Sequence, residues 1–299
     1  MILHVRDSLE SVAGVPEAVG YIFSFLFGAM IGSFLNVVIH RVPNEESIVF
    51  PNSACPRCGK AIKAYDNIPI FSWLILGGKC RSCKEPISPR YPAVELLTAL
   101  LYVLVYWQIG FGAFLPVAFV FVSTMIALVF IDSEHMILPN VITYPLLGFS
   151  LLIRTIFPNF FNGIYISDIN PWPVSQLSLS SPTPRSIIGA ILGAIVGGGF
   201  LWLVGELWKR LRGVDAMGLG DVKMMAAVGA LLGWRLTFLS IFFGAFSGAV
   251  IGVFLIASQK ERDFQTQVPF GIFLGIGSIV SLLFGDQLIA WYLTTFIPG

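Results

Sequence analysis

Long apolar runs dominate the chain and are separated by short polar segments. Runs of about 20 apolar residues are long enough to cross a bilayer as helices. We therefore expect an all-α, polytopic membrane protein with about eight membrane-spanning helices. Seven is the alternative, because the sixth run is short and ends at Gly233-Trp234-Arg235. The expected spans cover residues 19–39, 92–109, 112–131, 140–156, 186–207, 221–233, 235–257 and 270–292.

Composition supports a membrane location for most of the chain. Hydrophobic residues make up 56% of the 299 positions and charged residues only 12%, whereas soluble domains carry about 25% charged residues. The mean hydropathy is +0.83. The net charge is +1 and no basic tract occurs, so nothing suggests a nucleic-acid partner. No cleavable signal is evident ahead of the first run, which we expect to remain as an anchor.

The distribution of Lys and Arg orients these spans. With residues 55–83 on the cytoplasmic side, fourteen of the 18 Lys and Arg residues fall on that side and four on the other. Both termini are then expected outside, together with a loop over 157–184 that is rich in Pro, Asn and Ser. Glycines at four-residue spacing, such as Gly28/Gly32 and Gly271/Gly275, predict close helix packing within one bundle rather than a dimer interface. The oligomeric state stays open.

The four cysteines of the chain fall in one short cytoplasmic stretch. They form the pattern C-x2-C-x21-C-x2-C, whose spacing is typical of a four-sulfur zinc site with no open coordination position. We expect structural zinc, and the alternatives are unligated cysteines or a redox-active dithiol pair. Three segments follow: 1–39 with the first span, a zinc-binding domain over 40–91, and a transmembrane bundle over 92–299. The expected metal ligands are Cys55, Cys58, Cys80 and Cys83.

Two aspartates lie at the cytoplasmic ends of apolar runs, Asp132 after the third and Asp221 at the start of the sixth. Carboxylates are unfavourable beside lipid, so a pair at one face predicts a shared functional site. One ionised and one protonated carboxylate can hydrolyse a peptide bond, which points to an aspartic protease. Gly218 and Gly220 leave room for a substrate backbone, and Lys223 would help to keep one carboxylate ionised. The alternative is that each aspartate only caps a helix or pairs with a lysine.

Two further polar residues lie near these features. His135 follows Asp132 by three positions and could tune that carboxylate, although an interfacial polar residue is the simpler interpretation. Glu95, just inside the second span, could meet a positive group of a substrate or pair with an arginine of the cysteine-bearing segment. No G-x-S-x-G or H-E-x-x-H motif supports another class of hydrolase.

Assembled in order, these motifs resemble those of the bacterial prepilin peptidases, also called type IV leader peptidases and counted among GxGD-type aspartic proteases. The resemblance rests on GSFLNVVIHRVP at 32–43, the two cysteine pairs, NIPIFSWLILGGKCRSC at 67–83 and ISPRYPAVELLT at 87–98. It continues through the FID…LPN turn, GLGDVK at 218–223 and VPFGIFLGIG at 268–277. It covers nearly the whole chain.

This resemblance implies an enzyme of the bacterial inner membrane that cleaves the leaders of type IV prepilins and type II secretion pseudopilins at the cytoplasmic face. The family's catalytic aspartates fall on Asp132 and Asp221. Members with the cysteine-bearing loop commonly also methylate the new α-amino group with S-adenosylmethionine. The methyl-transfer site would be sought first in residues 32–43, with Asn36, His40 and Arg41, and no residue is assigned to it.

Other functions remain open at this stage. The chain could be a peptidase alone, with the zinc-binding loop serving to dock the substrate. It could also be a transporter or assembly scaffold without enzymatic activity, in which the aspartates relay protons or pair with lysines. Proteases of the presenilin kind are a nearer alternative, but their first aspartate lies deeper in the membrane than the polar turn after Asp132 indicates.

Overall fold

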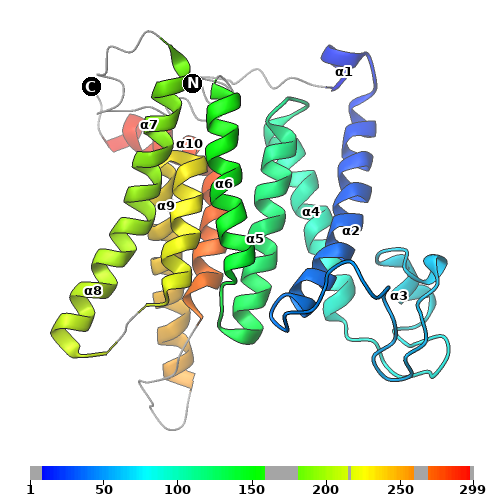
Figure 1. Cartoon of the computed structure of the whole chain (residues 1–299). Helices are drawn as coiled ribbons and strands as arrows, with labels where there is room; N and C mark the ends of the chain where they lie inside the picture. The colour runs from blue at the N-terminus through cyan, green and yellow to red at the C-terminus, as the bar shows by residue number, and fades with distance from the viewer. Residues whose placement is uncertain (1–8, 159–180, 215–216, 259–268, 297–299) are drawn as a thin grey trace. The chain divides into compact units, whose positions relative to one another are not determined.

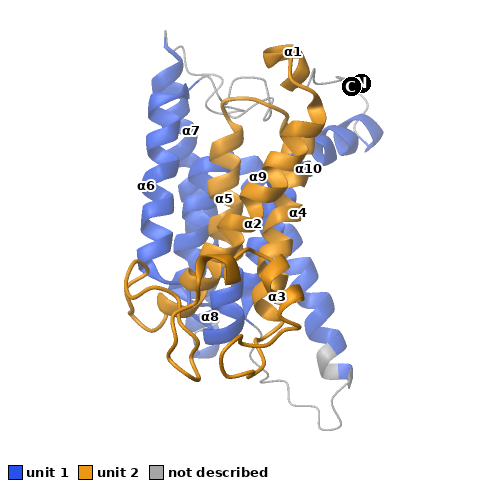
Figure 2. Ribbon diagram, turned by 90° about the vertical axis from the view of Figure 1, so that its right-hand side faces the viewer, with its two compact units in different colours: residues 1–4, 128–299 blue, residues 5–127 orange. Residues whose placement is uncertain are grey.

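The computed structural model of the chain describes residues 9–158, 181–214, 217–258 and 269–296. The described residues contain helices and no named strand, only the isolated bridges Ala54–Ala61 and Lys79–Pro86. Two compact units form, one from residues 5–127 and the other from residues 1–4 and 128–299 (Figure 2). We call them the N-terminal unit and the C-terminal unit. The expected division at residues 39 and 91 stays a prediction.

The N-terminal unit contains two long helices on either side of an irregular cysteine-bearing loop. Its elements are α1 (Leu9–Ala13), α2 (Glu17–Arg41), the 3-10 turn η1 (Ala64–Asp66), α3 (Phe71–Ile75), α4 (Arg90–Ile109) and the first part of α5 (Leu115–His135).

Small residues of α2 let it approach α4 closely. A Cβ on Gly28 would lie 2.8 Å from the Cα of Ala99, and one on Gly32 would lie 2.7 Å from the Cα of Glu95. The predicted close packing at this glycine pair is confirmed within the unit. The two helices thereby hold the start and end of the cysteine-bearing loop together.

The C-terminal unit consists of the end of α5 and a bundle of helices. The bundle contains α6 (Asn140–Ile156), α7 (Pro182–Ala194), η4 (Ile195–Gly199), α8 (Phe200–Arg212), α9 (Leu219–Ser258) and α10 (Phe270–Phe296). Helix α6 is tied to α9 by buried hydrogen bonds: the Ser150 hydroxyl donates to the Ala227 carbonyl at 3.2 Å, and Arg154 Nε donates to the Ala230 carbonyl at 3.1 Å.

Helix α9 consists of two helical segments joined at Gly233, whose φ of 77° and ψ of 168° are not helical. A Cβ on Gly197 would meet both the Met225 carbonyl and, at 2.8 Å, Cγ2 of Thr237. Twelve residues of continuous helix would separate these two by about 18 Å. The chain therefore reverses at Gly233, and both ends of α9 lie at the same end of the unit (Figure 1).

Six of the described helical segments are long and apolar enough to cross a membrane, which makes this a multi-pass membrane protein. One of the six is α9 taken as a single segment, and α6 is a shorter apolar helix. The predicted count of eight spans is not confirmed. The predicted boundary at Gly233-Trp234-Arg235, however, coincides with the reversal within α9. Most of the expected loop over 157–184 lies outside the described residues.

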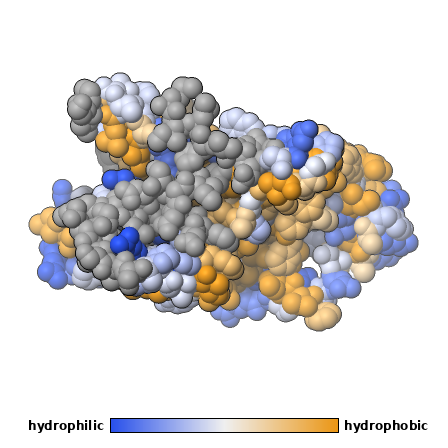
Figure 3. Space-filling view, turned by 90° about the horizontal axis from the view of Figure 1, so that it is seen from above, coloured by the Kyte–Doolittle hydropathy of each residue, from blue (hydrophilic) through white to orange (hydrophobic). Residues whose placement is uncertain are grey.

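Many large apolar side chains are exposed, as a lipid-facing surface requires. On α2 they include Ile22, Phe23 and Leu26, and on the second segment of α9 they include Phe242 and Phe246. Figure 3 shows hydrophobic residues reaching the surface alongside hydrophilic ones.

Candidate active site and metal centre

The two aspartates singled out from the sequence lie in one unit and close to each other. Asp132 lies near the end of α5, and Asp221 lies in the first turn of α9. Their side chains are only 5% and 8% exposed. Leu138 packs against glycines next to both of them, Gly220 beside Asp221 and Gly271 against Asp132. The sequence-based pairing of these two residues is therefore consistent with the fold.

The N-terminus of α10 completes the surroundings of Asp132. The backbone N–H of Ile272 donates to Asp132 Oδ2 at 3.1 Å. Helix α10 begins at Phe270, so this N–H is one of the unpaired donors of its first turn. The positive end of the helix dipole stabilises negative charge at this point. Asp132 is thus both a helix cap and a member of the carboxylate pair.

Leu138 and two glycines form the packed wall beside the carboxylates. A Cβ on Gly271 would lie 2.7 Å from Asp132 Oδ2 and 3.1 Å from Leu138 Cδ1, and one on Gly220 would lie 2.8 Å from Leu138 Cβ. Leu138 therefore joins the start of α9 to the start of α10. The sequence motifs included Leu138, in the FID…LPN turn, and Gly271, in VPFGIFLGIG, but did not indicate that the two contact each other or that Gly271 contacts Asp132.

Gly218 and Gly220 were both expected to leave room for a substrate backbone, but their surroundings in the structure differ. A Cβ on Gly218 would lie 3.6 Å from Asp221 Oδ2, so this glycine does leave space beside the carboxylate. The space at Gly220 is taken by Leu138 and is not open to a substrate backbone. Gly220 serves packing, and Gly218 is the glycine that flanks the Asp221 carboxylate.

Lys223 contacts α6. Its ammonium donates to Asn140 Oδ1 at 2.8 Å and lies 5.3 Å from the ring centroid of Tyr144. These contacts anchor the first turn of α9 to the first turns of α6, a different role from the expected support of an ionised carboxylate. His135 is the last residue of α5 and is exposed.

Such a carboxylate pair can activate water. Two buried carboxyl groups that lie close together cannot both ionise cheaply, so such a pair can hold one proton between its members. The ionised member can remove a proton from water while the protonated member donates to a carbonyl oxygen. This is the arrangement required for peptide-bond hydrolysis without a covalent intermediate.

The four cysteines of the N-terminal unit come together from two loops of the same shape. Gly59 N–H donates to the Cys55 carbonyl at 2.9 Å, and Lys84 N–H donates to the Cys80 carbonyl at 3.0 Å. Both donors have positive φ values, 67° for Gly59 and 63° for Lys84. The four sulfur atoms of Cys55, Cys58, Cys80 and Cys83 lie within 4.8 Å of one another.

This sulfur cluster fits a tetrahedral metal site. Zn–S bonds of about 2.3 Å in a tetrahedron place the sulfurs about 3.8 Å apart, and the Cys55 and Cys83 sulfurs are 3.8 Å apart. All four cysteines are free thiols in this structure. The residues could therefore hold a metal ion such as zinc, as expected from their spacing.

The electrostatics of the cluster favour a bound cation. Backbone N–H groups of Cys58 and Arg57 lower the pKa of Cys55, and those of Cys83 and Ser82 lower the pKa of Cys80 to about 6. At Cys83 the Glu85 N–H acts in the same direction, but desolvation and the neighbouring thiols outweigh it and raise the pKa to about 11. Four clustered thiolates repel one another, so a cation is needed to hold all four deprotonated.

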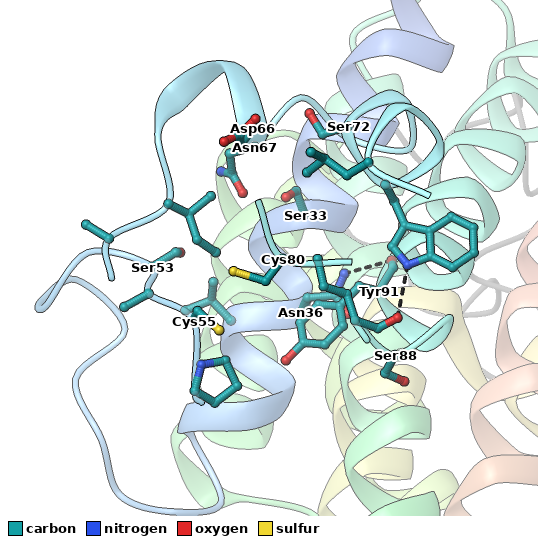
Figure 4. Close-up of a pocket in the computed structure, with 18 of the residues that line it drawn as sticks. Ser33, Asn36, Ser53, Cys55, Asp66, Asn67, Ser72, Cys80, Ser88 and Tyr91 are labelled. Atoms are coloured by element: carbon teal, nitrogen blue, oxygen red, sulfur yellow. Dashed lines mark hydrogen bonds between the residues drawn. The ribbon is translucent and has the colours of Figure 1, made fainter. Parts of the chain in front are cut away.

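A cavity of about 840 Å³ lies in the N-terminal unit beside the cysteine cluster. It is lined by α2, the cysteine-bearing loop and the start of α4, and Figure 4 shows Asn36, Cys55, Cys80 and Tyr91 around it. Asn36, His40 and Arg41, named above as the first place to seek a methyl-transfer site, all line it. Glu95 lines it too, and its carboxylate accepts the backbone N–H of Ile70 rather than a loop arginine.

Comparison with known proteins identifies similar sequences along nearly the whole chain. Residues 26–109 match the bacterial peptidase A24 N-terminal domain, and residues 119–253 match the type IV leader peptidase family. Proteins named prepilin leader peptidase/N-methyltransferase are similar throughout. The one from Aeromonas salmonicida (strain A449) is 36% identical, covering 97% of this chain and 99% of the relative.

Two further relatives with the same name extend this similarity. The Pseudomonas aeruginosa protein is 36% identical over 95% of this chain and 97% of its own length. The Burkholderia pseudomallei (strain 1026b) protein is 32% identical over 93% of this chain and 89% of its own length. No solved structure matches the chain.

Proposed function

The chain belongs to the type IV leader peptidase family, and we propose that it cleaves the leaders of prepilins or pseudopilins with Asp132 and Asp221 as the catalytic pair. The observation that carries this proposal is that two almost fully buried carboxyl groups, at the end of α5 and the start of α9, lie on either side of the same packed residue, Leu138. Two buried carboxyl groups placed together reduce stability, because each disfavours ionisation of the other. A function is therefore a better explanation of the pair than a structural role.

The residues of the site support a division of labour in hydrolysis. One carboxylate takes a proton from water, and the other, protonated, donates to the scissile carbonyl oxygen. The N–H of Ile272 holds Asp132 in a fixed orientation, and Leu138 packs the turn that follows α5 against both glycines. Gly218 leaves the side of Asp221 open for an extended peptide backbone.

The surface chemistry supports a membrane-embedded substrate. A prepilin leader precedes an apolar segment, and apolar side chains cover the outside of α2 and of the second segment of α9. The substrate would therefore enter from the bilayer, with its charged leader at the surface. The excess of Lys and Arg on one side of the sequence supports a cytoplasmic location for both aspartates and the cysteine cluster.

The second activity of the family is N-methylation of the new N-terminal residue. The relatives matched over almost the entire chain carry both activities in their names. The match to the A24 N-terminal domain covers α2, the cysteine-bearing loop and α4. We assign S-adenosylmethionine as the methyl donor and zinc as a structural ion of the four cysteines, which leave no coordination position for substrate.

Mass spectrometry on purified protein tests this function. The protein in lipid nanodiscs is incubated with a prepilin peptide, with and without S-adenosylmethionine. We expect cleavage in both reactions and a mature peptide heavier by one methyl group only with the donor. Asp132→Asn should abolish cleavage, whereas Glu134→Gln, an exposed carboxylate on the same turn, should not. A wild-type protein that leaves the peptide uncut would support a scaffold role instead.

A further inference from the structure

Helix α3, inside the cysteine-bearing loop, carries three large apolar side chains on its outer face. Phe71, Leu74 and Ile75 are 54%, 61% and 80% exposed. Their spacing of three and four residues places them on one side of the helix. We call these three side chains the α3 face. An exposed apolar patch of this kind marks an interaction surface, and neither leader cleavage nor metal binding as described above makes use of it.

The opposite side of α3 is fixed to the rest of the loop. Ser72 is only 7% exposed, and its Oγ accepts the Ile68 N–H at 3.0 Å and donates to the Tyr65 carbonyl at 3.1 Å. The indole Nε1 of Trp73 donates to the Ile87 carbonyl at 3.1 Å. The helix could turn its apolar side inward only by breaking these bonds. The α3 face is therefore held outward by the loop.

A hydrogen bond to α4 fixes the level of α3 along the long helices of the unit. The N–H of Ile70, the residue before α3, donates to Glu95 Oε2 at 2.6 Å. Glu95 lies beside Gly32 of α2, because a Cβ on Gly32 would be 2.7 Å from the Glu95 Cα. Helix α2 continues from Gly32 to Arg41, a distance of about 13 Å along its axis. The start of α3 is thus tied to a level well inside the end of α2.

This level corresponds to the edge of the hydrocarbon core of a bilayer. The 25 residues of α2 make a helix of about 37 Å, compared with about 30 Å of hydrocarbon. Even if the whole excess of about 7 Å lay at the Arg41 end, Gly32 would lie about 6 Å inside the hydrocarbon boundary. A tilt of α2 would place Gly32 deeper still. The Glu95 side chain then reaches Ile70 close to the boundary between hydrocarbon and headgroups.

The α3 face continues the apolar outside of the neighbouring helices. Helices α2 and α4 are both long and apolar enough to cross a membrane. Near the level of Gly32, α2 exposes Met30 and Phe34 (56% and 47%), and α4 exposes Leu96 and Leu97 (41% and 40%). Figure 1 shows α3 beside the ends of these two helices. The α3 face contains no charged or polar side chain, so its chemistry matches the lipid that surrounds its neighbours.

We propose that α3 is an interfacial membrane anchor, whose Phe71, Leu74 and Ile75 side chains insert among the lipid chains and hold the cysteine-bearing loop against the bilayer. Apolar side chains at this depth gain stability by leaving water for the boundary between headgroups and acyl chains. The partner is the bilayer itself rather than a second copy of the chain or a prepilin. The inference rests on the membrane location of α2 and α4 and does not depend on any catalytic activity.

Photolabelling from inside the bilayer tests this proposal. The full chain with its metal is placed, one copy per disc, in phosphatidylcholine nanodiscs that contain a phospholipid with a diazirine on its acyl chain. After irradiation, the labelled residues are mapped by mass spectrometry. We expect Phe71, Leu74 and Ile75 to be labelled to the same extent as Leu96 and Leu97 of α4. An unlabelled α3 face beside labelled α4 would overturn the proposal.

Val49 and Phe50 are the matched control within the same loop. They are 63% and 72% exposed, so they are as accessible as the α3 face. Arg41, the last residue of α2, donates to the Ser47 and Pro51 carbonyls on either side of them, which places them near the end of α2. They should be labelled weakly. Labelling of the α3 face no stronger than that of Val49 and Phe50 would contradict the anchor.

A pair of double variants tests which side chains hold the loop. Leu74→Asp/Ile75→Asp should lower the labelling of Phe71, leave that of Leu96 unchanged, and speed limited proteolysis of residues 44–90 in nanodiscs. Val49→Asp/Phe50→Asp introduces the same charges in the same loop and should do none of these. Unchanged labelling of Phe71 in the first variant would refute the anchor.

The rival occupants of the α3 face give different results in the labelling experiment. If labelling is lost when two copies share a disc, the face binds a second copy. If it is lost on addition of a prepilin peptide, the face binds the substrate, and either result would replace the proposal. Labelling of the wild-type chain requires neither a folded variant nor a substrate. Its outcome is therefore independent of whether the chain cleaves prepilins.

Discussion

The carboxylate of Asp132 accepts a hydrogen bond from the backbone N–H of Ile272, 140 positions later in the chain, at 3.1 Å. This bond fixes one member of the proposed catalytic pair against the first turn of α10. The helix-cap role considered for this aspartate and its proposed catalytic role are thus compatible, because the bond from Ile272 engages only Oδ2 and leaves the second carboxylate oxygen available.

Gly271→Ala should impair cleavage strongly. The added Cβ would lie 2.7 Å from Asp132 Oδ2 and would push the carboxylate out of position. A misplacement of this kind lowers kcat by about 10- to 100-fold, with a smaller effect on the affinity for substrate. Gly252→Ala is the control, since a Cβ there meets nothing within 4 Å. Equal activity of the two variants would show that α10 does not position Asp132.

Substitution of Gly220 should act through Leu138. A Cβ at position 220 would lie 2.8 Å from Leu138 Cβ, so Gly220→Ala displaces the turn that follows Asp132. We expect a loss of cleavage and partial recovery in the double variant Gly220→Ala/Leu138→Gly, which removes the obstructing atom. Initial rates on a prepilin peptide measure both. If Leu138→Gly gives no recovery, Gly220 contacts the substrate directly, as the sequence alone suggested.

Lys223→Gln should have a mild effect. The ammonium is held by Asn140 and Tyr144, so its removal loosens the contact between α9 and α6 without exposing the carboxylates. Contacts of exposed charged groups contribute about 0–1 kcal/mol, and we expect a small fall in Tm and a change of a few-fold in kcat. If Lys223→Gln lost as much activity as Asp221→Asn, the result would support the electrostatic role predicted for Lys223 from the sequence.

Metal removal should loosen the cysteine-bearing loop before the rest of the chain. The loop holds few buried apolar side chains, so its order depends on the cluster. Chelation should make residues 44–90 the first site of limited proteolysis. Because neighbouring thiols and desolvation raise the pKa of Cys83 while backbone N–H groups lower that of Cys80, the cluster should be only partly deprotonated at neutral pH, and rebinding zinc should displace protons from it. Protons compete for the thiolates, so metal affinity should fall with falling pH.

Titration calorimetry in two buffers of different ionisation enthalpy counts the displaced protons. A loop that stays protected from protease without metal would refute the structural role of zinc. The matched control is Ser82→Ala, which changes the cysteine-bearing loop without removing a sulfur.

The chemistry-bearing residues were the most predictable part of this protein. The cysteine spacing alone predicted the cluster of four sulfurs. The unfavourable energy of carboxylates near lipid was enough to single out Asp132 and Asp221 as a candidate pair. The reversal at Gly233 was also marked by the Gly-Trp-Arg interruption of the apolar pattern.

Contacts between distant segments could not be predicted. Nothing in the local sequence shows that Leu138 fills the space of two glycines, or that Gly271 touches Asp132. Likewise the hydrogen bond from Asn36 Nδ2 to the Tyr91 carbonyl joins residues 55 positions apart. Such features arise from how helices pack, which a single sequence with uniformly apolar helices specifies only weakly.

A double-mutant comparison of leader cleavage tests the central claim that the two aspartates act as one unit. Initial rates are measured for the wild type, Asp132→Asn, Asp221→Asn and the double variant. When two residues act as one unit, the effects of substituting them on the rate are not additive. Each single variant should therefore lose activity by a factor of about 10³ or more, and the double variant should lose no more than either single variant. A single variant with near wild-type rate, or losses that multiply in the double variant, would contradict the account.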